Sequence, residues 1–211
     1  FEIFLFPETG YSRTQFLFNG EDRRAYVRSN KYTGVITSNI LAQTEFTINT
    51  YNIIMEQNVG GTVKIRDEAN NILWSPNIII LQPGDSQPSS GEFVNSEVTT
   101  TRGHIWVYED KLVVTYDTFV RLFAIPNNYT NGVSTEGYRV SSFIINSVSI
   151  SVSGDVAGSS DYSTRTNISA RATFSINRYS VDIAQFEGGS ASASPSDVTW
   201  DNSSAISVTL S

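Results

Sequence analysis

The chain has no cysteine, and this absence excludes several kinds of chemistry at once. Disulfide bonds, thiolate nucleophiles and cysteine-ligated zinc cannot form in it. The absence is unusual for a small secreted domain held together by disulfides, whereas it is compatible with structural proteins of virus particles and with bacterial or archaeal surface proteins.

Histidine is almost absent as well. The single histidine, His104, would have to carry any Ser–His–Asp arrangement alone, and its run of period two with Trp106 indicates an ordinary strand position. No nucleophile elbow, phosphate-binding loop or dinucleotide fingerprint occurs. Glycoside hydrolysis by two carboxylates is the remaining enzymatic alternative. Its candidates are Glu45, Glu56, Glu109, Asp110 and Asp117. We expect no catalytic residues.

Positive charge is scarce. The chain has 14 Lys and Arg against 21 Asp and Glu, a net charge of −7, and its densest basic group, in residues 23–31, directly follows Glu21 and Asp22. A protein that binds the phosphate backbone usually presents a continuous basic surface. We therefore expect no direct contact with nucleic acid.

Long apolar runs are also missing. No segment approaches the roughly 20 apolar residues that a membrane-spanning helix needs, so no membrane span is expected. The first residue is Phe1 rather than Met, which suggests a processed or trimmed N-terminus.

The feature that is present throughout is alternation with period two. In Thr166–Asn177 the apolar residues fall on one face and Ser, Thr, Asn and Arg on the other. Val148–Ser153 and Ile206–Ser211 repeat this pattern. Such segments are typical of half-buried strands with an apolar inner face and a hydroxyl-rich outer face.

Further strands are expected in several short segments. These are Glu2–Phe6, Thr14–Phe18, Phe46–Glu56, Thr62–Arg66, Asn77–Gln82, His104–Tyr108, Lys111–Tyr116 and Phe119–Ile125. The continuous run Ile78–Leu81 predicts a central strand covered on both faces, and the two residues between Tyr108 and Lys111 predict a tight hairpin.

The fold class follows from these segments. We predict an all-β chain with little or no helix, built as an antiparallel β-sandwich of the jelly-roll or Greek-key type. Residues 1–211 are expected to form one sandwich domain, with residues 1–31 as a possible N-terminal arm or exchanged strand. The alternative is two domains divided near residues 82–91, a loop rich in Pro and Gly.

Two kinds of binding site are candidates. Trp74, Trp106, Trp200 and Tyr129 are aromatic residues that would stack on a sugar or contact a receptor if exposed, with core packing as the alternative. No cofactor is expected. Calcium is the one metal considered, through Asp155 and Asp161, with turn-forming Asp residues as the alternative.

Both ends of the chain are expected to be strands. The predicted assembly residues are Phe1, Ile3, Leu5, Ile206, Val208 and Leu210. An apolar strand at an end must pair, either within its own sheet or with another copy by β-augmentation. Both arrangements remain open.

These observations favour a non-enzymatic structural protein that self-assembles. It would be a virion component (capsid, decoration or tail protein) or a surface filament subunit, located in the virion or at the cell surface, with copies of itself or other proteins of the same particle as partners. The first alternative is a module that binds a receptor or carbohydrate. The second is a pore-forming protein, in which Ser142–Asn177 would supply a membrane-inserting hairpin.

Overall fold

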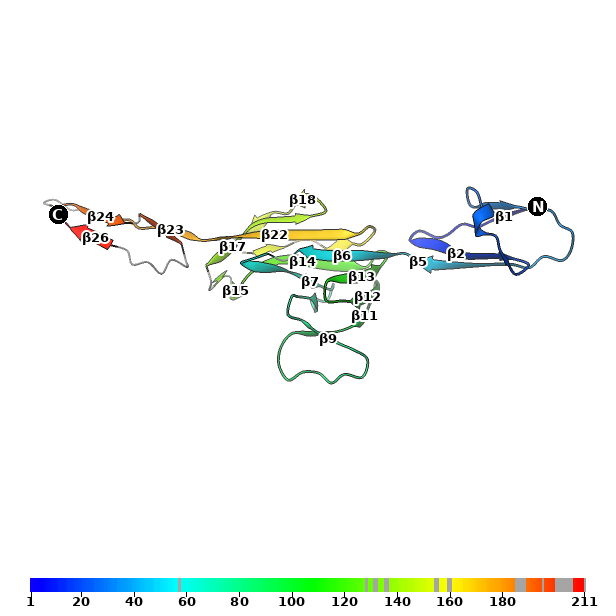
Figure 1. The fold of residues 1–211 in the computed structure, drawn as a ribbon, viewed down its shortest axis with the longest axis horizontal. Coiled ribbons are helices and arrows are strands. Elements are labelled where there is room, and N and C mark those ends of the chain that lie inside the picture. The colour runs from blue at the N-terminus through cyan, green and yellow to red at the C-terminus, as the bar shows by residue number, and fades with distance from the viewer. Residues whose placement is uncertain are drawn as a thin grey trace.

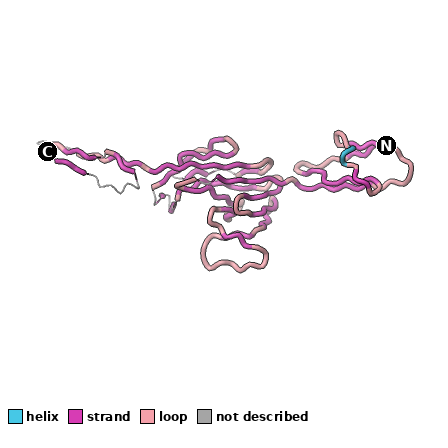
Figure 2. The backbone as a smooth tube through the Cα atoms, viewed as in Figure 1, coloured by secondary structure: helices cyan, strands magenta, loops and turns pink. Residues whose placement is uncertain are grey.

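The structure is a computed structural model of residues 1–211. It describes residues 1–56, 58–127, 129–130, 133–134, 137–153, 156–158, 161–184, 189–194, 196–199 and 207–210, without the side chains of 129–130, 133–134, 197–199, 207–208 and 210. In this part of the chain nearly every element is a strand, and the one helical piece is the 3₁₀ turn η1 (Arg24–Tyr26) (Figure 2). The predicted all-β, sandwich-type fold is confirmed. None of the described residues forms a helix long and apolar enough to cross a bilayer.

Two sheets form a sandwich in the middle of an elongated molecule (Figure 1). The first sheet has the order β11 (Glu97–Thr100), β12 (Gly103–Val107), β13 (Lys111–Thr115), β6 (Thr50–Glu56), β22 (Ile168–Ile176), β17 (Tyr138–Ile145), β18 (Val148–Ser149). The second has the order β19 (Val152–Ser153), β20 (Val156–Gly158), β14 (Phe119–Pro126), β7 (Gly61–Arg66), β8 (Ile72–Trp74), and β21 (Tyr162–Ser163) also pairs with β14.

Alternation along the strands builds the core between the two sheets. In β22, Ile168, Ala170 and Ala172 are buried while the residues between them are exposed, as predicted. The largest fully buried side chains of this core are Phe143, Ile53, Ile65, Leu73, Ile105, Leu112, Leu122 and Ile145. Burial of these apolar side chains is the main source of stability for the sandwich.

Most neighbouring strands of these two sheets are antiparallel. The hairpin of β12 and β13 is formed as predicted, and the Tyr108 N–H donates to the Lys111 carbonyl at 2.9 Å. β22 instead runs parallel to β6. Parallel neighbours need a long connection, and here most of the sandwich lies between them along the chain.

Residues 1–48 form a separate small unit, here called the N-terminal unit. A ribbon of β1 (Glu2–Phe4) and β4 (Lys31–Thr33) packs on a sheet of β3 (Glu21–Asp22), β2 (Tyr11–Phe18) and β5 (Ala42–Ile48). Its own core consists of the buried Leu5, Phe16, Val27 and Tyr32, with Phe1, Ile3 and Phe18 packed against them. The arm predicted over residues 1–31 lies within this unit.

The single strand predicted over Phe46–Glu56 is interrupted at Asn49. The Asn49 N–H donates to the Gly10 carbonyl at 2.7 Å, whereas its carbonyl accepts from the Tyr116 N–H at 2.8 Å. The chain therefore leaves the sheet of the N-terminal unit and enters the sandwich at this residue.

A thin arm of paired strands lies at the opposite end of the molecule (Figure 1). Its two pairs are β23 (Arg178–Ser180) with β25 (Asp197–Thr199), and β24 (Ala191–Ser194) with β26 (Ser207–Leu210). The strand predicted at the end of the chain is thus present and pairs with β24. A short pair of β15 (Tyr129–Thr130) and β16 (Val133–Ser134) completes the described strands on this side of the sandwich.

The prediction of a central strand at Ile78–Leu81 is wrong. β9 (Ile79–Leu81) pairs only with β10 (Phe93–Asn95), in a parallel two-stranded sheet, and Ile79 is exposed. An apolar run flanked by prolines does not distinguish a central strand from a peripheral one that rests on the core by one face. The loop of residues 82–92 connects these two strands and projects from the sandwich (Figure 1).

The inward apolar face predicted for Val148–Ser153 is also wrong. Val148 and Val152 are exposed, and only Ile150 packs against the core. The reason is that the segment is not one strand: β18 belongs to the first sheet and β19 to the second, so the chain crosses between the sheets here. Within Ser142–Asn177, the antiparallel partner of β22 is β17, and β18 to β21 lie between these two strands along the chain.

Candidate functional site

The outward side of the β1–β4 ribbon is the first candidate interaction surface, because it exposes aromatic side chains. We call it the ribbon face, and it consists of Glu2, Phe4, Phe6, Lys31 and Thr33. Alternation along β1 turns Phe1, Ile3 and Leu5 the other way, into the core of the N-terminal unit.

Three of the six predicted assembly residues, Phe1, Ile3 and Leu5, thus anchor β1 within its own chain. Ile206 and the side chains of Val208 and Leu210 lie outside the described residues. The ring of Phe1 stacks on Phe18 with centroids 5.5 Å apart, and Leu5 is buried. The residues that β1 presents to the outside are the intervening ones. Sequence reasoning missed them because residues 1–6 are apolar on both faces, so that alternation alone did not identify the outer one.

Two of these outward residues form an exposed aromatic pair. The rings of Phe4 and Phe6 are stacked, with centroids 5.9 Å apart and planes at 8°, although the residues are 56% and 68% exposed. Beside them, Lys31 Nζ donates to Glu2 Oε1 at 2.8 Å, which neutralises both charges of the ribbon face. A contiguous exposed apolar patch bordered by polar groups is typical of an interaction surface.

The backbone of β1 adds a free strand edge to this surface. Phe1, Ile3 and Leu5 use their N–H and C=O groups toward β4: the Phe1 carbonyl accepts from Gly34, and the Leu5 N–H donates to Asn30 at 2.8 Å. In an antiparallel pair the residues between them direct these groups to the opposite side. Among the described strands β1 pairs only with β4, so the groups of Glu2 and Phe4 face away from the ribbon.

A second candidate site is a shallow hollow of about 460 Å³ on the outer face of the first sheet. Its lining consists of Glu56, Ile144, Asn146, Ser147, Ser169 and Arg171. Most of these groups are polar and point outward from neighbouring strands.

The rim of this hollow is held by the turn between β17 and β18. Asn146 and Ser147 both have positive φ, of 48° and 66°, as in the turns that suit two-residue hairpins. The Asn146 side chain accepts from the Ser169 N–H at 2.8 Å and donates to the Asn167 carbonyl at 3.3 Å. At the other side, Arg171 Nε and Glu56 Oε2 are 4.0 Å apart.

The predicted aromatic contact residues do not come together. Trp74 is buried, and its indole N–H lies within 3.3 Å of the carbonyls of Tyr108 and Glu109, so it belongs to the core. Trp106 is half-buried on the outer face of β12, with its ring 4.4 Å from that of His104. Trp200 and the side chain of Tyr129 lie outside the described residues.

Asp161, one of the two predicted calcium ligands, faces an arginine. Both of its carboxylate oxygens accept hydrogen bonds from the Arg121 guanidinium. A calcium ion there would have to displace the guanidinium, and Asp155 lies outside the described residues. Among the described residues, no three His, Cys, Asp or Glu side chains gather in a way that would hold a metal ion. The calcium site stays a prediction.

Hydrogen bonds and ion pairs shift the pKa values of three carboxyl groups of the sandwich. Hydrogen bonds from Arg121 lower the pKa of Asp161. Hydrogen bonds from Ser163 and then from Arg165 lower the pKa of Asp117. For Glu92, burial alone would raise the pKa, but hydrogen bonds from Lys64 and Ser75 outweigh it and leave the pKa lowered. These groups are ionised salt-bridge partners rather than proton donors.

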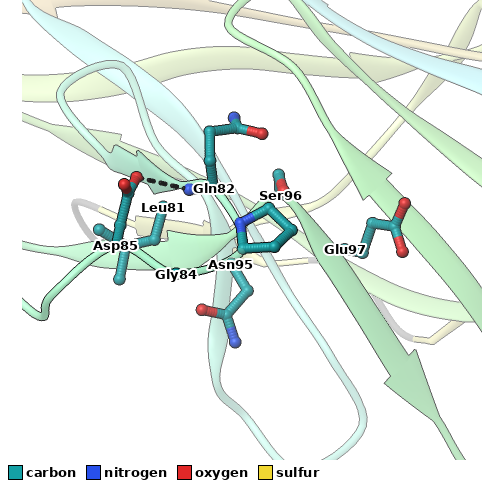
Figure 3. A pocket seen from close by; sticks show the side chains of 8 residues that line it. Leu81, Gln82, Gly84, Asp85, Asn95, Ser96 and Glu97 are labelled. Atoms are coloured by element: carbon teal, nitrogen blue, oxygen red, sulfur yellow. Dashed lines mark hydrogen bonds between the residues drawn. The ribbon is translucent and has the colours of Figure 1, made fainter.

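Another hollow, of about 280 Å³, lies at the base of the loop of residues 82–92 (Figure 3). Asp85 and Glu97 are its acidic residues, and Asp85 Oδ2 accepts from the Gln82 N–H at 2.7 Å, as in a turn that Asp stabilises. Asn95 and Ser96 add an amide and a hydroxyl group to the lining.

The carboxylates considered for glycoside hydrolysis lie in different parts of the fold. Glu45 is on β5 in the N-terminal unit and Glu56 on β6, whereas Asp117 is paired with Arg165 at 3.0 Å. Glu109 and Asp110 lie in the exposed turn between β12 and β13. Comparison of the chain with protein-family models, with curated proteins and with solved structures found no match.

Proposed function

We propose that the chain is a non-enzymatic structural protein that self-assembles, as a component of a virus particle (capsid, decoration or tail protein) or as a subunit of a surface filament. The observation that carries the proposal is the ribbon face, where a stacked and exposed pair of Phe side chains lies beside a free strand edge. Such an edge is a template for another strand unless the protein protects it.

The elongated arrangement supports this function. The N-terminal unit and the strand-paired arm lie at opposite ends of the sandwich, so each is accessible to a neighbouring molecule (Figure 1). The arm consists of two strand pairs, and the N-terminal unit consists of one strand pair and a three-stranded sheet. Contacts at such ends extend an assembly without covering the sandwich.

The distribution of charge also supports it. Residues 1–48 hold five of the 21 acidic and five of the 14 basic residues, so the net charge of −7 belongs to the rest of the chain. The negative remainder favours solubility, whereas the neutral end approaches another molecule without repulsion.

Assembly is measured by light scattering coupled to size-exclusion chromatography across a concentration series, followed by electron microscopy of the same samples. We expect a concentration-dependent increase in mass and particles of regular shape. A chain that remains monomeric at every concentration, alone and with the proteins of its own particle, contradicts the proposal.

The second candidate function is carbohydrate or receptor binding, and the hollow at Glu56 and Arg171 favours it. Carboxylate, guanidinium, amide and hydroxyl groups converge there around Ile144, which are the groups that orient a polar ligand such as a sugar. Trp106 lies on the outer face of the same sheet.

A glycan array with the intact protein tests this alternative. Binding that is lost in Glu56→Gln and in Arg171→Ala, and retained in the control Glu109→Gln, supports it. No binding above background, or binding that both hollow variants retain, contradicts it.

A further inference from the structure

We propose that the partner of β1 is β1 of a second copy of the chain, in an antiparallel pair around a twofold axis at Phe4. This inference rests on the proposed assembly function and specifies one of its contacts. It joins two ribbons into a continuous sheet with the order β4, β1, β1 of the partner and β4 of the partner.

The backbone is arranged for this pairing. The N–H and C=O groups of Glu2 and Phe4 face the free edge, and the same alternation places those of Phe6 there, since the Leu5 N–H is used toward Asn30. With the axis at Phe4, Phe4 lies opposite Phe4 of the partner, and Glu2 lies opposite Phe6 of the partner. Each of these pairs exchanges two hydrogen bonds, so the contact uses every outward group of this segment.

The side chains of the ribbon face then meet on one side of the new sheet. The two stacked pairs of Phe4 and Phe6 form one aromatic cluster, which removes from water the surface that is now 56% and 68% exposed. Glu2 remains bonded to Lys31, so the pairing leaves no unpaired charge at the contact.

A second copy is favoured over a different partner by symmetry and by charge. A twofold axis at Phe4 places Glu2 of each copy opposite Phe6 of the other, so the same contact occurs twice and the pair is isologous and closed. The charge of −7 carried by residues 49–211 makes other faces of two copies repel, whereas two N-terminal units are neutral. Glu2 and Glu8 would repel an acidic partner strand.

Cysteine cross-linking tests the pairing directly, because the chain has no cysteine of its own. Residues opposite each other in a hydrogen-bonded antiparallel pair have Cα atoms about 5.5 Å apart, within the range that a disulfide spans. In the full-length chain, Phe4→Cys is expected to give a covalent dimer under mild oxidation. The control Val59→Cys introduces a thiol in a turn of the sandwich, at a residue that is more exposed than Phe4 (86% against 56%), and reports the rate of random collision.

A mixture of Glu2→Cys and Phe6→Cys tests the register. The disulfide between Glu2→Cys and Phe6→Cys is expected to form faster than a disulfide between two copies of either variant. Phe4→Ser/Phe6→Ser, measured by sedimentation without any cysteine, is expected to weaken the dimer at least ~10-fold, because it removes the aromatic cluster and leaves the core residues of β1 in place. Val59→Ser is the matched control and keeps the dimer.

Cross-linking of Phe4→Cys no faster than that of Val59→Cys overturns the inference, and so does dimerisation unchanged in Phe4→Ser/Phe6→Ser. If the chain still forms particles in that case, another strand, such as one from the arm of a neighbouring copy, occupies the edge and the assembly function stands. If the cross-link forms but no assembly exceeds a dimer, the pairing stands and the assembly function fails.

Discussion

The ring of Tyr116 lies directly against the α-carbon of Gly10, at the joint between the N-terminal unit and the sandwich. Around this contact, Asn49 bonds to both residues: its N–H donates to Gly10, and its carbonyl accepts from the Tyr116 N–H. Arg165 adds a cation–π contact to the Tyr116 ring at 5.8 Å. The two parts of the molecule are therefore joined by a packed contact and by two hydrogen bonds as well as by the chain itself.

Gly10→Ala should destabilise this joint. Gly10 has a φ of 85°, which a side chain disfavours, and an added Cβ would overlap the Tyr116 ring. The backbone cost is about 1 kcal/mol and the overlap adds about 1–3 kcal/mol. Gly20→Ala is the matched control, since Gly20 has a φ of 81° but nothing near the added Cβ. Urea unfolding of both variants measures the difference, and equal losses of stability would contradict a tight joint.

The two hydrophobic cores predict two separable losses of stability. Phe16 is fully buried in the N-terminal unit and Phe143 in the sandwich. Truncation of a buried Phe to Ala costs about 3–5 kcal/mol. We expect Phe16→Ala to raise amide hydrogen exchange within residues 1–48 and Phe143→Ala to raise it in the sandwich. Mass spectrometry of peptides resolves the two regions, and exchange raised throughout the chain by Phe16→Ala would show that the cores unfold as one.

Much of this architecture follows from alternation, and its failures have a common cause. The inner face of β22 was predictable because Ile168, Ala170 and Ala172 are separated by polar residues that have no place in a core. Phe4 and Phe6 carried no such signal, because both faces of β1 are apolar. The hydrophobic pattern of a strand indicates which of its faces can be buried. It does not indicate whether another element of the fold covers that face.

Pairing between distant segments was the other part that the sequence did not specify. Val148–Ser153 has the alternation of one strand, yet the chain passes from one sheet to the other within it. The ion pair of Arg121 with Asp161 likewise depends on β14 lying beside the segment that follows β20. Such contacts depend on topology, which local spacing does not determine.

The Arg121–Asp161 pair predicts a dependence of stability on pH. Hydrogen bonds from Arg121 lower the pKa of Asp161 below its ordinary value of 3.8, so the folded state favours the ionised carboxylate. This contribution is present above about pH 4 and is lost as the pH falls through the lowered pKa. Asp161→Asn should therefore lower the urea midpoint at about pH 7 and have little effect at the acid end of the range.

Glu109→Gln serves as the control for this pH series, because the described residues offer Glu109 no ion pair. Its midpoint should follow that of the unchanged protein at each pH. A deficit in Asp161→Asn that stays constant down to about pH 2 would assign its effect to packing rather than to charge. Added salt should reduce the deficit, since the pair is partly exposed.

Thr115→Val should cost more stability than its small change in shape suggests. The buried Thr115 Oγ1 accepts from the His104 N–H at 3.0 Å and is 3.0 Å from Thr118 Oγ1. Valine fills the same volume but leaves that N–H without an acceptor, which costs about 1–3 kcal/mol. Thr115→Ser keeps the hydroxyl and should recover most of the loss, whereas the exposed Thr47→Val should stay within about 0.5 kcal/mol of the unchanged protein. Equal stabilities of Thr115→Val and Thr115→Ser in urea unfolding would show that the hydroxyl contributes nothing, and that the link between β12 and the turn after β13 depends on packing alone.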